Sequence, residues 1–113
     1  MAQALKIDIV TQTVTPVTIN SLEDITTTIG NGCSSLNIYQ YPNGDFMYYD
    51  FASLFREPII GGFVTEGTNT LLFNNAVIIG YADGNYSDCV SQASAITSAT
   101  TWYDQAYCQD AIK

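Results

Sequence analysis

Hydrophobic and polar positions follow a two-residue period at the start of the chain, which predicts β-strands. Residues 5–10, LKIDIV, alternate apolar with charged side chains, as in a strand with one wet face. Residues 14–19, VTPVTI, form a second β-branched run, and its Pro16 has no N–H to donate to a strand ladder. We therefore expect a first hairpin whose second strand lies at a sheet edge or contains a bulge.

The spacing then changes to that of a short helix. Asn20 or Ser21 can cap its first turn, and Gly30 or Gly32 can end it. The apolar residues that recur at helical spacing are Leu22, Ile25 and Ile29. A run of three threonines has mediocre helix propensity, so we expect this helix to depend on packing against a sheet.

The clearest element is a second hairpin at residues 35–51, SLNIYQYPNGDFMYYDF. Two alternating runs flank Pro42-Asn43-Gly44, where glycine readily takes the positive φ that a hairpin turn requires. In simple register one face of this hairpin carries Tyr39, Tyr41, Met47 and Tyr49, and the other carries Phe46 and Tyr48. The following residues, 52–70, mix apolar side chains with proline and glycine and predict an irregular connection.

The last third of the chain predicts a central strand and a second helix. Residues 76–79, AVII, are apolar on both strand faces, which is typical of a strand covered on both sides. We interpret the loop after it, YADGNYSD, as a turn into a helix that begins at Ser87 or Asp88. The stripe of that helix would consist of Cys89, Val90, Ala93, Ile96, Thr100, Tyr103 and Tyr107.

These elements predict one α+β domain over residues 1–113. We expect an antiparallel or mixed sheet of about five strands, with the short first helix and the C-terminal helix packed on it.

The charge balance bears on partners and location. Three basic and eleven acidic residues give a net charge of −8, which would repel a phosphate backbone, so we expect no nucleic-acid partner. No apolar run reaches the roughly 18 residues of a membrane span, and the N-terminus lacks the pattern of a signal peptide. We expect a cytoplasmic protein without a membrane partner. Three widely spaced cysteines fit reduced thiols better than a disulfide framework.

The chain offers few residues for metal or catalytic chemistry. Asp83, Asn85 and Ser87 have the spacing of the first oxygen ligands in a calcium loop, but Asp88 and Ser94 stand where glycine and glutamate are required. There is no histidine, so we expect no metal, no cofactor and no enzymatic activity. The alternative is a small carboxylate-dependent enzyme, which would use acids among Asp45, Asp50, Asp83 and Asp88.

Aromatic residues are the best candidates for binding. Tyr39, Tyr41 and Tyr49, with Met47, could form a face that takes a partner or ligand, since tyrosine offers large contact area and a hydroxyl at low entropic cost. The alternative is cross-strand aromatic pairing that stabilises the hairpin. Arg56 could clamp an anionic ligand or form a surface ion pair.

Three segments together resemble a small domain of unknown function carried by bacteriophages and mobile elements. They are IDIVTQTVTPVTI, SLEDITTTIGNGCSSLNIYQYPNGDFMYYD and NNAVIIGYADGNYSD, and they cover roughly residues 5 to 90. Tyr81-Ala82 before Asp83-Gly84 departs slightly from the pattern of that family.

The resemblance implies a phage or viral accessory protein in the cytoplasm of an infected bacterium, and it carries no catalytic residues across. We therefore expect a non-enzymatic protein that binds or sequesters a host component, either a protein or a small molecule, in a role such as counter-defence. The alternative is a structural homo-oligomer closed by the tyrosine face.

Overall fold

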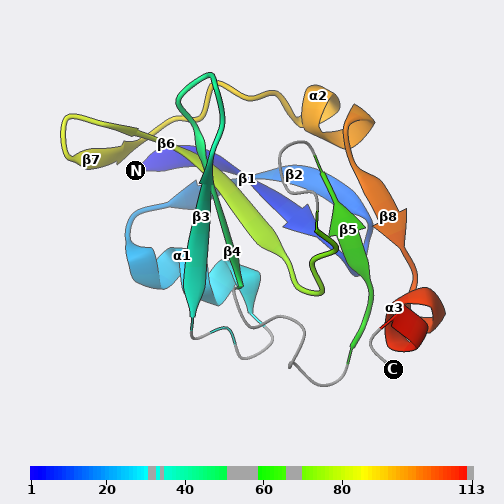
Figure 1. The fold of residues 1–113 in the computed structure, drawn as a ribbon. Coiled ribbons are helices and arrows are strands. Elements are labelled where there is room, and N and C mark those ends of the chain that lie inside the picture. Colours follow the sequence, from blue (N-terminus) through cyan, green and yellow to red (C-terminus); the bar gives the residue numbers. More distant parts are fainter. Residues whose placement is uncertain (31–32, 34, 51–58, 66–69, 112–113) are drawn as a thin grey trace.

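A computed structural model describes residues 1–30, 33, 35–50, 59–65 and 70–111 (Figure 1). Its largest element is an antiparallel sheet, the main sheet, with strand order β2-β1-β6-β4-β3 and with β7 paired to the far end of β6. The strands are β1 (Ala2–Asp8), β2 (Thr13–Ile19), β3 (Leu36–Gln40), β4 (Phe46–Asp50), β6 (Ala76–Ala82) and β7 (Asn85–Ser87).

Smaller elements cover the two faces of the main sheet. The helix α1 (Leu22–Ile29) lies on one face. The other face is covered by α2 (Ala93–Ser98) and by a two-stranded ribbon, the β5–β8 ribbon, made of β5 (Gly62–Val64) and β8 (Thr101–Tyr103). The C-terminal helix α3 (Gln105–Ala111) packs Cys108 against Ile59 and Phe73. This arrangement confirms a single α+β domain with an antiparallel sheet.

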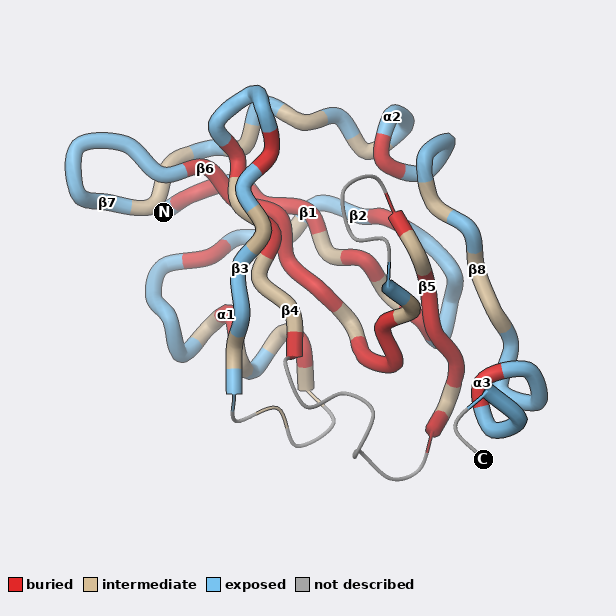
Figure 2. The backbone as a smooth tube through the Cα atoms, viewed as in Figure 1, coloured by how far each residue is buried: buried red, intermediate tan, exposed pale blue. Residues whose placement is uncertain are grey.

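The strand β6 is central because its side chains are apolar in both directions. Ala76, Val77, Ile78 and Ile79 are all fully buried. Val77 and Ile79 pack on the side of α1, whereas Ala76 and Ile78 pack on the side of the β5–β8 ribbon. Residues 76–80 of this strand form a continuous buried segment through the middle of the molecule (Figure 2), whereas Tyr81 and Ala82 at its end are exposed. The prediction of a central strand covered on both sides is confirmed.

The helix α1 begins and ends at the predicted residues. The Oγ of Ser21 accepts a hydrogen bond from the Asp24 N–H at 3.3 Å, and Gly30 takes φ 69° where the helix stops. Ile25 and Ile29 are completely buried against the sheet. Leu22, the third apolar residue at helical spacing, is 52% exposed and does not share this burial.

The β3–β4 hairpin has a three-residue turn with glycine in its last position. The Tyr41 carbonyl accepts from the Gly44 N–H at 3.0 Å, and the Tyr41 N–H donates to the Asp45 carbonyl at 2.8 Å. Gly44 has φ 97°, which glycine adopts without strain. Tyr39 pairs with Met47 across the hairpin, as the simple register predicted.

Neither outer strand of the main sheet has a free outward hydrogen-bond donor near its middle. Pro16 lies in the edge strand β2, as predicted, and has no N–H. Because both backbone groups of Tyr41 face β4, the alternation of an antiparallel ladder turns the Ile38 N–H outward. That N–H donates to the Asn37 Oδ1 at 2.9 Å, so the neighbouring side chain occupies it.

The prediction of one long helix from residue 87 or 88 to residue 107 is wrong. Asp83 and Gly84 have φ 55° and 80°, which makes a two-residue hairpin turn, so the chain returns as β7 rather than entering a helix. The later stretch divides into α2, β8 and α3. Threonines at residues 97, 100 and 101 weaken helix propensity, and Trp102 pairs with Phe63 of β5 instead. The loop is a turn, as predicted, but it joins two strands.

The irregular connection predicted for residues 52–70 lies partly outside the described residues. Within it the structure shows β5, where Gly62 passes very close to the neighbouring chain. A Cβ on Gly62 would lie 2.6 Å from the Leu72 carbonyl oxygen, so no larger residue fits without a shift of the backbone.

Candidate functional site

The predicted binding residues of the β3–β4 hairpin share one face, and that face points into the core. Tyr41 is 4% exposed and Met47 is fully buried, while Tyr39 and Tyr49 are partly buried against the same cluster. The Tyr39 and Tyr41 rings meet edge to face at 5.0 Å, and the Tyr41 hydroxyl lies 3.7 Å from the Met47 sulfur. Tyr41 and Met47 are therefore core residues that offer a partner almost no surface, although Tyr41 also lines a hollow of about 230 Å³ between the hairpin turn and α2. The other predicted residue, Arg56, lies outside the described residues.

The opposite face of this hairpin belongs to an uncovered aromatic surface. We call it the aromatic patch, and it consists of Ile38, Phe46, Tyr48, Tyr81 and Tyr86, contributed by β3, β4, β6 and β7. Adjacent rings contact one another along the series Phe46–Tyr81–Tyr86–Tyr48, with centroid distances of 6.3, 5.9 and 6.2 Å. The ring planes are steeply inclined, which is the favourable edge-to-face geometry.

Strand alternation brings these side chains to the same face. Phe46 pairs with Ile79 and Tyr48 pairs with Val77, so both rings point to the side of the sheet on which α1 lies. Tyr81 continues that row two residues beyond Ile79. The helix α1 packs on Val77 and Ile79 but leaves the far end of β6 and the β7 hairpin uncovered (Figure 2).

The β6–β7 turn adds Tyr86 to the patch. Tyr81 pairs directly with Tyr86 because the turn at Asp83-Gly84 contains only two residues. Gly80 allows the returning strand to approach, since a Cβ there would lie 2.6 Å from the Asp88 carbonyl oxygen. The positive φ at Asp83 and Gly84 and the bare backbone at Gly80 thus set the position of the tyrosine pair.

The patch is exposed and hollowed. Tyr81 is 50% and Ile38 is 48% exposed, whereas Tyr48 and Tyr86 are less exposed than these two. The five patch residues line a shallow hollow of about 330 Å³. A second hollow of about 470 Å³ lies between the start of β1, the end of β2 and the β6–β7 hairpin, and also has Tyr81 and Tyr86 in its wall. The tyrosine pair therefore forms a ridge between two concave surfaces.

The hydroxyl of Tyr48 is less acidic than that of an ordinary tyrosine. Burial raises the pKa of Tyr48 to about 12, and a side-chain hydrogen bond with Tyr86 adds to this increase. Its hydroxyl therefore stays protonated well into the alkaline range and can serve as a hydrogen-bond donor at neutral pH.

A spectroscopic titration should show this late ionisation. One tyrosinate signal is expected to rise with a midpoint near pH 12 in the wild type and to disappear in Tyr48→Phe. Because the unfolded pKa is about 10, the contribution of Tyr48 to stability is fully present below pH 10 and is lost as the pH rises through the folded pKa. Circular dichroism at each pH verifies that the chain is folded. A Tyr48→Phe variant with an unchanged late signal would contradict the assignment.

Among the described residues, the buried carboxylates are Asp45 and Asp50, and each has structural partners at one end of β4. Asp45 is 2% exposed, and its carboxylate accepts hydrogen bonds from the Val90 N–H at 3.1 Å and the Ser91 N–H at 2.8 Å. The Ser91 hydroxyl donates to the same carboxylate. Asp50, which is 1% exposed, accepts from the Asn74 side-chain amide at 3.1 Å. These bonds hold the hairpin to neighbouring segments.

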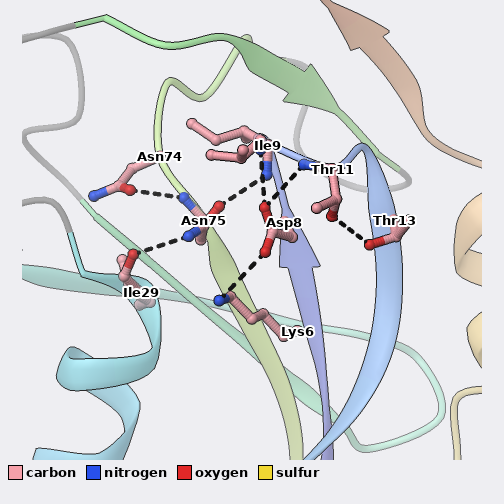
Figure 3. A network of polar contacts seen from close by, with 9 residues as sticks. Lys6, Asp8, Ile9, Thr11, Thr13, Ile29, Asn74 and Asn75 are labelled. Atoms are coloured by element: carbon pink, nitrogen blue, oxygen red, sulfur yellow. Dashed lines mark hydrogen bonds and ion pairs between the residues drawn. The ribbon is translucent and has the colours of Figure 1, made fainter.

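A pair of asparagines joins three segments at the end of the sheet where β6 begins (Figure 3). The Asn75 Oδ1 accepts from the Ile9 N–H at 2.8 Å, and its Nδ2 donates to the Ile29 carbonyl at 3.1 Å. Asn74 donates to the Gly30 carbonyl at 3.0 Å. The end of β1 and the end of α1 are thus fastened to the start of β6 by side-chain amides. In the sequence these asparagines only marked a break between two apolar runs.

The other candidate residues do not assemble into a metal or catalytic site. Asp83 and Asn85 lie in and beside an exposed hairpin turn, and Asp88 accepts from the Gln3 N–H at 2.8 Å. Among the described residues no cluster contains three or more side chains of histidine, cysteine, aspartate or glutamate. Within the same residues no helix is long and apolar enough to cross a membrane.

The thiols of Cys89 and Cys108 are not activated. Burial raises the pKa of the Cys89 thiol, and the nearby Asp45 carboxylate raises it further. Burial likewise raises the pKa of Cys108, with a contribution from Asp104. A raised pKa keeps both thiols protonated at neutral pH, and the thiol is a much weaker nucleophile than the thiolate.

Comparison with known proteins adds no relative from which a function could be transferred. A scan against protein families finds no match to this chain. Searches of curated proteins and of solved structures also find none. The resemblance to a phage-borne domain stays a prediction, and the functional argument depends on the geometry of the chain itself.

Proposed function

We propose that this protein is a non-enzymatic binding protein and that the aromatic patch is its recognition surface. The observation that carries the proposal is the series of ring contacts from Phe46 to Tyr48, which runs over a part of the sheet that α1 leaves uncovered. Protein interfaces are enriched in tyrosine and phenylalanine because such rings bury much area at low entropic cost.

The resemblance to a phage-borne domain supports the biological setting of the proposal. A small accessory protein that binds or sequesters a host component needs a recognition surface and no reactive groups. The protonated thiols and the separated carboxylates agree with such a role.

The two alternatives have weaker support from the geometry. A homo-oligomer closed by Tyr39 and Tyr41 is disfavoured because Tyr41 packs inside its own chain. A carboxylate-dependent enzyme would require two acids in one cleft. Asp45 and Asp50 instead lie at opposite ends of β4, and neither lines either of the two hollows beside Tyr81.

The test is a pull-down from a bacterial lysate with immobilised wild-type protein and two variants. Ile38→Ser with Tyr81→Ser removes the two most exposed patch residues and should abolish retention of the wild-type partner, because their apolar contacts are lost. Tyr107→Ser is the matched control, since Tyr107 is 53% exposed on α3, away from the patch. It should retain the partner.

Circular dichroism should show that all three proteins have the same fold. If the patch variant retains the same partner as the wild type, the patch is not the recognition surface. Absence of any retained partner with the wild type would count against the binding role itself.

A further inference from the structure

The aromatic patch has a chemical preference that follows from its lining and from the charge around it. Its hollow is lined only by aromatic rings and Ile38, without a charged side chain. The face of a tyrosine ring carries negative electrostatic potential and attracts cations, most often the arginine guanidinium. A partner that supplies cationic side chains can therefore use the rings directly.

Carboxylates flank the patch along the same hairpin. Asp83 lies in the turn between Tyr81 and Tyr86, and Asp88 follows one residue after β7 ends. Both are exposed. The Oδ1 of Asp88 accepts a hydrogen bond from the Gln3 N–H at 2.8 Å. An exposed acid in this turn and a second one directly after β7 raise the local attraction for a positive group.

The wider charge of the protein favours the same kind of partner. The chain carries a net charge of −8. Among the described residues Lys6 is the only one with a basic side chain, and its Nζ lies 3.3 Å from the Asp8 Oδ2. The resulting negative potential attracts basic partners over a distance and repels nucleic acid and a second copy of this chain.

We propose that the aromatic patch binds a segment of another protein that is rich in arginine and lysine. Cationic side chains would stack on Tyr81 and on the neighbouring rings while further charges pair with Asp83 and Asp88. The inference depends on the proposed binding function, to which it adds the class of the partner. Each exposed cation–π contact changes the affinity by only about two- to fivefold, so specific binding requires several of them together.

The inference is tested with labelled peptides of defined charge and fluorescence anisotropy. A peptide with alternating arginine and glycine should bind, whereas the peptide with glutamine in place of arginine should not. Tyr81→Ser should weaken binding by about two- to fivefold, the equivalent of one cation–π contact. Tyr107 has a similar exposure on α3, and Tyr107→Ser should leave the affinity unchanged.

Charge variants separate local pairing from the general attraction of an acidic protein. Asp83→Asn should weaken binding more than Asp110→Asn, which removes the same charge from the exposed surface of α3. Added salt should weaken the complex, since screening acts on exposed charges. Equal losses in the two variants, or an unchanged affinity in Tyr81→Ser, would overturn the inference because both results indicate non-specific attraction.

The outcomes also separate this inference from the proposed function. If the patch variant loses a lysate partner while the wild type fails to bind the arginine peptide, the inference is overturned and the binding function stands. Sedimentation of the wild type and of Tyr81→Ser tests a second copy as the occupant. A dimer that Tyr81→Ser dissociates would overturn the inference, and a monomer in both cases agrees with it.

Discussion

Replacement of Phe63 by alanine should lower the free energy of unfolding by about 3–5 kcal/mol, the cost of removing a large side chain from a closed core. Phe63 is completely buried, and its ring lies 6.2 Å from that of Trp102. Its backbone exchanges two hydrogen bonds with Leu72, each of 2.9 Å, so the cavity cannot close by a simple shift of the strand. A domain of this size has a total stability of only about 5–15 kcal/mol, so the change is large.

Denaturation followed by circular dichroism measures this loss, and Val64→Ala is the control. Val64 is the next residue of β5 and is only partly buried, so its truncation should cost clearly less. The midpoint should fall while the denaturant slope stays constant, since the surface exposed on unfolding is nearly the same. A loss under about 1 kcal/mol for Phe63→Ala would show that the β5–β8 ribbon does not share the core of the main sheet.

Replacement of Asp45 by alanine is expected to cost about 2–4 kcal/mol, because the donors that its carboxylate satisfies lose a buried acceptor. The Val90 and Ser91 N–H groups both donate to it, and the Ser91 hydroxyl adds a third bond. We expect the loss in the free energy of unfolding to be smaller than the sum for three hydrogen bonds to a charged group. Val90 is exposed, so water can hydrate its N–H once the carboxylate is removed.

Amide hydrogen exchange locates the effect of Asp45→Ala. Exchange of the Val90 and Ser91 amides should become much faster, because these bonds fasten the segment between β7 and α2 to the hairpin tip. Asp83→Asn removes an exposed charge while asparagine tolerates the positive φ of this turn, so it should change neither stability nor exchange at these residues. Unchanged protection of both amides in Asp45→Ala would mean that the carboxylate does not hold this segment.

Local chemistry made much of the fold predictable. The N–H of Asp24 meets the Ser21 hydroxyl, Gly44 takes a positive φ, and Pro16 lies in an edge strand, each for a reason that is visible in a few consecutive residues. The all-apolar run at residues 76–79 similarly required cover on both sides.

The C-terminal third could not be predicted in the same way because long-range pairing decides it. Apolar residues between Cys89 and Tyr107 do recur at helical spacing, yet Trp102 pairs with Phe63 across the β5–β8 ribbon. A strand of three residues gains its stability from the partner strand, which the local pattern does not contain.

The aromatic patch was missed for a related reason. Asp83-Gly84 is a strong hairpin signal, and tyrosines lie at equal distances on either side of it, at Tyr81 and Tyr86. Because a helix was predicted after this turn, Tyr81 and Tyr86 were not recognised as neighbours on one hairpin. The tyrosines of the β3–β4 hairpin, which lie close together in the sequence, were therefore predicted to bind a partner. In the structure the β5–β8 ribbon and α2 cover that face of the hairpin, and the local sequence does not reveal this cover.

The outer edges of the main sheet determine which modes of recognition and self-assembly this protein favours. Pro16 on one side and the Asn37 side chain on the other remove the central donors that an incoming strand would pair with. Growth of the sheet into fibrils from these edges is thereby discouraged, even for a chain so rich in β-structure. Recognition is accordingly left to side chains on the faces, where a partner can dissociate without disturbing the backbone ladder.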